Sequence, residues 1–156
     1  MLLFLENTSV SMKRVYLLSE ELMNDHERIA LAQNLTLDSS RPLMGLKGTH
    51  GLFGSVEWWR SIDENKIPLL FISGVIKRAY VAGQDEGDIN NTVDLVLDDG
   101  SITTVGIYTN NVDDVSLFCV GSHVSVVYAL DELKKQPSRD GGVNYSRVAL
   151  EMAVSI

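Results

Sequence analysis

The chain has 156 residues, of which 45% are apolar, and its 21 acidic and 13 basic side chains give a formal net charge of −8. This length fits one domain, or one small domain with an N-terminal extension, and the apolar content excludes a disordered chain. The negative charge disfavours nucleic acid as a partner, because binding to phosphates depends on Lys and Arg. An acidic surface serves solubility or meets a basic protein.

Residues 12–37 contain one helical candidate, which begins near Ser19. Leu18, Leu22 and Ile29 recur on one face at helical spacing, while charged side chains occupy the remaining face. A second short helix is expected over residues 55–64, after a stretch that is rich in glycine and proline. Residues 1–65 are therefore predicted to form an N-terminal helical arm with a Gly-rich loop.

From residue 66 onward, apolar side chains recur at every second position, which is typical of strands with one buried face. Asp99-Gly100 lies between two such runs and is a strong hairpin signal, because glycine adopts the positive φ of a tight turn without strain. A loop of two or four residues would place Leu97 opposite Ile102. Five strands are predicted, over residues 69–82, 92–98, 101–108, 123–130 and 145–154, with a short helical segment at 111–120.

The order of these elements predicts a mainly β (α+β) domain over residues 66–156, a small five-stranded antiparallel barrel that is OB-like. Ser73-Gly74 interrupts the first strand, and a long, bent first strand can serve two sheets in such a barrel. The helical segment before the fourth strand fits the same arrangement, and an SH3-like barrel is the alternative.

Alternation along the strands also assigns the core. In the second strand it places Val93, Leu95 and Leu97 inward. In the last strand it places Leu150 inward and Glu151 outward. The residues predicted to share one core are Leu95, Leu97, Ile102, Val126 and Leu150.

No catalytic or metal-binding pattern stands out. His26, His50 and His123 have no ligand-like spacing, and no zinc-binding motif accompanies them. Cys119 has apolar neighbours and is expected to be buried as packing rather than to act as a nucleophile. The acidic loop 84–90 lacks the ligand spacing of a calcium loop and is expected to be solvated. We therefore predict no cofactor and no metal, and favour a binding protein over an enzyme.

The segment 51–60 is unusually aromatic. Two adjacent tryptophans cannot face one side of a helix, so one ring should pack inward while the other stays near the surface. The first interpretation is a hydrophobic clasp that ties the N-terminal arm to the barrel. The second is a protein-binding site, because Trp and Arg dominate interface energetics. The candidate protein-binding residues are Phe53, Trp58, Trp59 and Arg60.

The single cysteine excludes an intrachain disulfide, and residues 1–5 are apolar but too short for the core of a signal peptide. No stretch approaches the roughly 18 apolar residues that cross a bilayer. We expect a bacterial, cytoplasmic protein with no membrane partner. Met12 is a candidate alternative start, which would make residues 1–11 a poorly ordered leader.

The leading hypothesis is a non-catalytic protein-interaction module with an acidic surface. One concrete form is an immunity- or antitoxin-type inhibitor whose acidic face meets a basic partner. Two alternatives stay open: an OB-type binder of a small ligand or of single-stranded nucleic acid, and an enzyme with an unrecognised site. The outward positions of the second and third strands carry no basic or aromatic residue, which argues against nucleic acid. A homo-oligomer is also compatible with the sequence.

Overall fold

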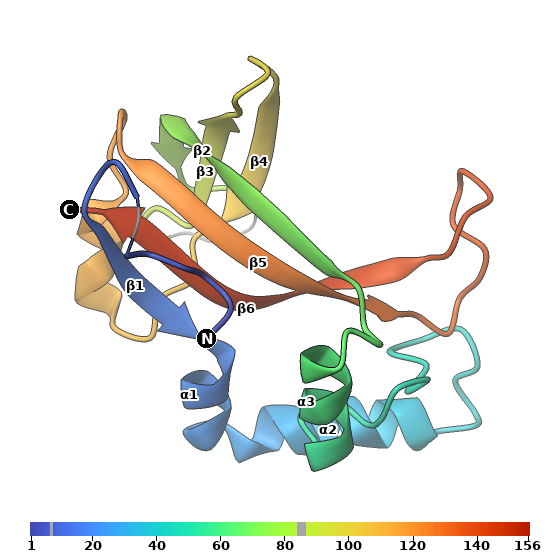
Figure 1. Cartoon of the computed structure of the whole chain (residues 1–156). Helices are drawn as coiled ribbons and strands as arrows, with labels where there is room; N and C mark the ends of the chain where they lie inside the picture. Colours follow the sequence, from blue (N-terminus) through green and yellow to red (C-terminus); the bar gives the residue numbers. More distant parts are fainter. Residues whose placement is uncertain (7, 84–86) are drawn as a thin grey trace. The chain divides into compact units, whose positions relative to one another are not determined.

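A computed structural model describes residues 1–6, 8–83 and 87–156, so part of the predicted acidic loop, residues 84–86, lies outside the described residues. Six strands form one sheet in the order β1-β6-β5-β2-β3-β4 (Figure 1). The strands are β1 (Met12–Leu17), β2 (Leu69–Tyr80), β3 (Thr92–Val96), β4 (Ile102–Gly106), β5 (His123–Glu132) and β6 (Tyr145–Ser155). The helices are α1 (Leu18–Met23), α2 (His26–Leu37), α3 (Val56–Asp63) and the 3₁₀ helix η1 (Val112–Leu117).

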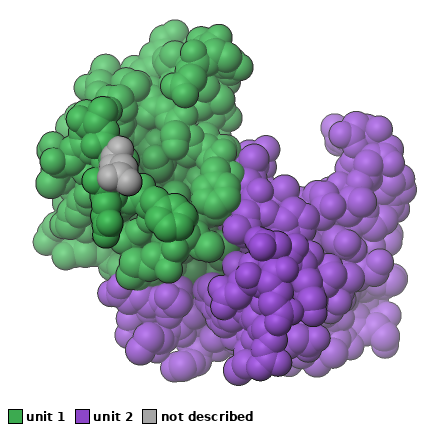
Figure 2. Space-filling view, viewed as in Figure 1, with its two compact units in different colours: residues 1–18, 71–127, 149–156 green, residues 19–70, 128–148 purple. Residues whose placement is uncertain are grey.

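The chain divides into two compact units (Figure 2). Unit 1 comprises residues 1–18, 71–127 and 149–156, and unit 2 comprises residues 19–70 and 128–148. Each unit is assembled from separated segments, whereas the domains predicted from the sequence follow one another along the chain. Unit 1 contains ten acidic and four basic residues, and unit 2 contains eleven and nine. Most of the net negative charge therefore belongs to unit 1.

All five predicted strands are present, and the mainly β, α+β class is confirmed. The sixth strand, β1, comes from a segment in which we expected only a helix and a leader. It pairs antiparallel with β6 and forms one edge of the sheet, while β4 forms the other. The sheet is therefore open, and closure into an OB-like or SH3-like barrel is not confirmed.

The β3–β4 hairpin differs from the expected pairing by one residue. Val96, not Leu97, lies opposite Ile102. The N–H of Leu97 donates to the Ser101 carbonyl, and the N–H of Gly100 donates to the Leu97 carbonyl, both at 2.9 Å. Gly100 has a φ of +83°, so residues 98–100 form a three-residue loop with glycine in the left-handed region. Because this loop has an odd length, Ile102 turns away from the core and is 52% exposed.

One face of the sheet forms the core of unit 1. Val93 and Leu95 are fully buried, as alternation predicted, whereas Leu97 is only half-buried. Gly74 allows β3 to approach β2 closely, since a Cβ at Gly74 would lie 2.7 Å from the carbonyl oxygen of Val96.

Glu151 was predicted to face solvent but is buried. Its carboxylate accepts the N–H of Leu2 at 2.6 Å and the N–H of Leu3 at 3.1 Å. Arg14 on β1 donates to the same carboxylate at 3.2 Å and to the Leu3 carbonyl at 2.6 Å. Leu2 and Leu3 are thus tied to β1 and β6 by hydrogen bonds.

The helical segment of unit 1 also differs from expectation. Helix η1 follows Asn111, whose side chain accepts the N–H of Asp113, as a cap should. Phe118 anchors its end and is buried, while Cys119 is exposed. The prediction that Cys119 is buried packing was wrong, because the chain turns outward after Phe118.

In unit 2, the single predicted N-terminal helix is divided into α1 and α2. Asp25 interrupts it because its carboxylate accepts the N–H of Arg28 and caps α2. Helix α3 begins after Ser55, whose hydroxyl accepts the N–H of Trp58 at 3.2 Å. None of the described helices is both long and apolar enough to cross a membrane.

Candidate functional site

The four predicted site residues all lie in unit 2 but differ in exposure. Phe53 is 4% exposed and Trp58 is fully buried. Trp59 is half-buried and Arg60 is exposed. The Trp58 ring meets the rings of Phe53 and Trp59 edge to face, at centroid distances of 5.1 and 4.9 Å. Direct contact with a partner therefore falls to Trp59 and Arg60, whose role in binding stays a prediction.

A buried hydrogen bond fixes Trp58. Its indole Nε1 donates to Oδ2 of Asp131 at 2.9 Å, and Asp131, on β5, is 2% exposed. The bond satisfies the polar edge of a buried indole, which usually needs a partner. Trp58 thus ties α3 to β5 within unit 2, as the clasp interpretation requires of one of the two rings.

Asp131 provides a test by pH. Burial raises the pKa of its carboxyl, and the hydrogen bond from Trp58 only partly opposes this. The folded chain therefore holds this proton more tightly than the unfolded chain, so ionisation of Asp131 costs stability as the pH rises through the raised pKa. We expect Asp131→Asn, which keeps an acceptor for Trp58, to unfold at higher urea concentration than the parent at neutral pH. This advantage should shrink towards about pH 4. An advantage that does not change with pH would contradict the assignment.

A second candidate surface, the open sheet face, lies in unit 1 on the side of the sheet opposite its buried core. Val75 pairs with Val96, which in turn pairs with Ile102, so these three side chains share this face. A register shift in β2 after Ile76 returns Arg78 to the same face. Ser125 joins this face through its hydrogen bond with Ser73, and His123 lies two residues before it on the same strand. The residues of the open sheet face are Phe71, Ser73, Val75, Arg78, Tyr80, Asp94, Val96, Ile102, Thr104, His123 and Ser125.

A polar cluster occupies the centre of this face. Asp94 accepts hydrogen bonds from Thr104 at 2.7 Å and from Tyr80 at 2.9 Å, and Arg78 lies 3.5 Å away. These hydrogen bonds, and then the Arg78 charge, hold the pKa of Asp94 below its ordinary value, so the carboxylate stays ionised. The Arg78 guanidinium carbon lies 3.8 Å from the centroid of the Tyr80 ring. A cation and an anion are thus presented side by side.

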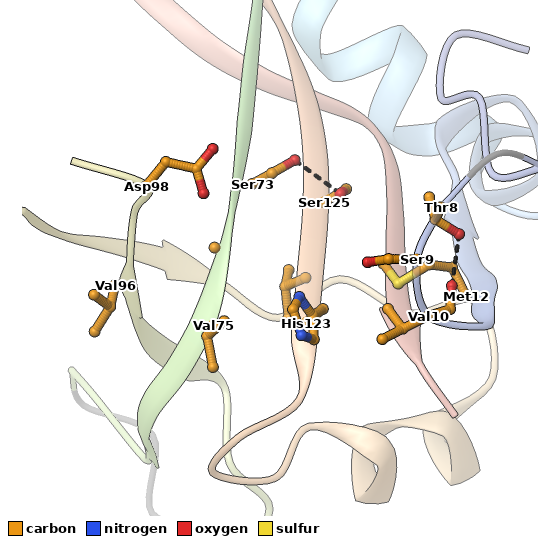
Figure 3. Close-up of a pocket in the computed structure, with 12 residues that line it drawn as sticks. Thr8, Ser9, Val10, Met12, Ser73, Val75, Val96, Asp98, His123 and Ser125 are labelled. Atoms are coloured by element: carbon orange, nitrogen blue, oxygen red, sulfur yellow. Dashed lines mark hydrogen bonds between the residues drawn. The ribbon is translucent and has the colours of Figure 1, made fainter. Parts of the chain in front are cut away.

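A hollow of about 310 Å³ is lined in part by residues of the open sheet face, among them Ser73, Val75 and Val96 (Figure 3). Ser73 on β2 and Ser125 on the neighbouring strand β5 share a hydrogen bond of 2.8 Å in its wall, which His123 also lines. Residues 8–10 line the opposite side. Within the described part of the chain, no group of three or more His, Cys, Asp or Glu side chains could hold a metal ion.

The composition of the open sheet face is typical of a protein-binding surface. Phe71 and Ile102, which are 55% and 52% exposed, lie on the same face as the Arg78–Tyr80 pair. Aromatic residues and Arg are enriched in interfaces and carry much of their energy. This surface was not predicted from the sequence, because Ile102 was expected in the core. The available signal was Phe71 among the residues of the first predicted strand.

Comparison with known families identifies the chain. The model of the family described as immunity protein RhsI2 matches residues 12–155, which include all six strands. No curated protein matches the chain. The match supports the predicted immunity-type inhibitor, which binds another protein and is not a catalyst. Because it covers nearly the whole sequence, the chain belongs to the RhsI2 family of immunity proteins.

Proposed function

We propose that this protein neutralises a toxic protein by binding it, and that it meets a basic surface of this toxin with unit 1. The observation that carries the proposal is that two features occur together in unit 1. This unit holds ten acidic against four basic residues, and it also carries the open sheet face. Apolar contact would supply affinity, and the surrounding negative charge would speed encounter with a basic partner.

Exposed acidic residues of unit 1 support this part of the proposal. Asp88, Asp98 and Asp113 are all exposed in unit 1. Exposed charges of one sign raise the rate of association with an oppositely charged partner, and added salt weakens this effect. We also propose that binding takes place in the cytoplasm, where the exposed thiol of Cys119 would stay reduced.

The first experiment tests neutralisation. A tagged full-length chain is cross-linked in its host, and the captured protein is identified by mass. The captured protein, produced alone in a laboratory strain, should arrest growth, and co-production of the chain should restore it. If the captured protein arrests growth whether or not the chain is present, the proposed function is wrong.

The second experiment tests the charge of the partner surface. Association with the purified toxin should slow at least about tenfold between low and moderate salt, with little change in dissociation. Replacement of Asp88, Asp98 and Asp113 by Asn should slow association in the same way. The matched control replaces three exposed acidic residues of unit 2, Glu20→Gln, Glu27→Gln and Asp63→Asn. Equal slowing by both triple variants, or association independent of salt, would contradict a unit 1 surface for a basic partner.

A further inference from the structure

The two edges of the sheet are protected to different degrees. Edge strand β1 carries Lys13 and Arg14, and its register with β6 is irregular after Arg14. Its outer backbone groups are also occupied within unit 1. The N–H of Asn110 donates to the Val15 carbonyl at 2.9 Å, and the N–H of Leu17 donates to Asn110 Oδ1 at 2.8 Å. Charge, irregularity and cover are the devices that prevent another strand from pairing with an edge.

Strand β4 lacks these devices. Its sequence, Ile-Thr-Thr-Val-Gly, contains no charged residue and no proline. Its pairing with β3 is regular from Gly106 to Ile102. It is rich in β-branched residues, which favour strand pairing. Strand β4 pairs with β3 and is the last strand in the sheet order, so no strand of the described residues lies beside one row of its backbone groups.

The hairpin hydrogen bonds show which groups form this row. The N–H of Leu97 donates to the Ser101 carbonyl. At the other end of the hairpin, the N–H of Ile107 donates to the Asn91 carbonyl. Hydrogen-bonded pairs alternate along an antiparallel ladder, so Thr103 and Val105 point their backbone groups towards β3. The outward backbone groups belong to Ile102, Thr104 and Gly106.

We infer that the toxin docks on this edge, by adding an extended segment of its own to β4 beside the open sheet face. The inference rests on the proposed function, which supplies a protein partner, and it specifies how that partner is held. Backbone hydrogen bonds would give such a complex its register, and alternate side chains of the added strand would lie beside Ile102 and Thr104.

The charges beside the edge indicate the chemistry of this segment. Asp98 and Asp99 lie in the turn that leads into β4, whereas Asp94, which shares the open face with Thr104, is already paired with Arg78 at 3.5 Å. Residues 92–107 contain no basic side chain. The matching segment therefore alternates apolar residues with Lys or Arg. A second copy of this chain fits less well, because two units with the same excess of negative charge repel each other.

Amide hydrogen exchange, read residue by residue by NMR on the full chain, tests the edge directly. In the free chain, Thr103 and Val105 should be protected, whereas Ile102, Thr104 and Gly106 should exchange rapidly. In the complex with the captured toxin, these three amides should slow by at least about 100-fold. If these three amides stay unprotected in the complex, although co-production of the chain restores growth, edge pairing is wrong and the proposed function stands.

A pair of variants at one position separates the backbone from the side chain. Thr104→Pro removes the outward N–H and leaves the ladder to β3, which proline tolerates on an edge strand. Thr104→Val keeps the N–H and removes the hydroxyl that bonds Asp94. We expect Thr104→Pro to weaken toxin binding roughly 5- to 150-fold, because it leaves a carbonyl of the toxin unpaired. Equal losses in both variants would overturn the inference.

A second pair of variants tests the same edge even if Thr104→Pro does not fold. Ile102→Lys adds to β4 the kind of charge that protects natural edges. Val120→Lys also replaces an exposed apolar side chain by Lys, at a site in unit 1 that is 71% exposed. Ile102→Lys alone should weaken toxin binding by about tenfold or more. Equal losses of toxin binding in the two variants would overturn the assignment of this edge to the toxin. The assignment would also be overturned if the parent chain alone forms a dimer that Ile102→Lys abolishes, because the edge would then pair two copies of the chain.

Discussion

Replacement of Trp58 by Ala is expected to lower the free energy of unfolding by about 3–5 kcal/mol, the usual cost of truncating a core aromatic residue. The Trp58 ring is fully buried against Phe53. The variant would leave a cavity, and it would also remove the donor that serves buried Asp131. An unpartnered buried acceptor adds its own cost, so the loss should lie in the upper part of this range. Urea denaturation of the chain without any partner measures it.

Trp59→Ala is the matched control for this prediction. Its ring is half-buried, and removal should cost about 1–2 kcal/mol. If Trp59 anchors a partner, the same variant should weaken toxin binding well beyond its effect on folding. Two variants that both unfold like the parent would exclude the clasp and make residues 51–60 the leading functional surface.

The strands that the sequence predicted are those whose pattern is local. In β3, alternation identified Val93 and Leu95 as core residues, and both are fully buried. The hairpin itself was also recognised, because Gly100 is a local turn signal. The register of the hairpin was not recognised, because one residue more or fewer in the loop decides whether Ile102 faces the core or the solvent.

The features that the sequence analysis missed depend on contacts between distant segments. Strand β1 pairs residues 12–17 with residues 151–155, and nothing in the local pattern links the two ends of the chain. Alternation in β6 correctly placed Leu150 inward. It could not show that residues 1–6 cover the opposite face, where Glu151 lies.

The candidate functional site was likewise only partly predictable from the sequence. Composition was enough to single out the aromatic segment 51–60, but not to show that Trp58 is buried while Arg60 is exposed. The open sheet face follows from the register of three strands, which only the structure supplies. A surface built by strand pairing is therefore harder to predict than one carried by a single helix.

The buried carboxylate of Glu151 gives the second large effect. Replacement of Glu151 by Ala is expected to lower the free energy of unfolding by about 2–4 kcal/mol, because removal of one partner leaves a buried charge unpaired. The side chains of Glu151 and Arg14 are 6% and 22% exposed, so the guanidinium could recover part of its hydration. The backbone N–H groups of Leu2 and Leu3 would lose their acceptor as well.

A double-mutant cycle separates these two losses. If the stranded charge of Arg14 is the main cost, Arg14→Met in the Glu151→Ala background should regain at least about 1 kcal/mol. If the loss instead comes from release of residues 1–6, Arg14→Met should give no recovery, and amide exchange at Leu3 should rise in Glu151→Ala alone. Additive effects of the two single variants, measured by urea denaturation, would show that the ion pair contributes nothing beyond holding the N-terminal segment.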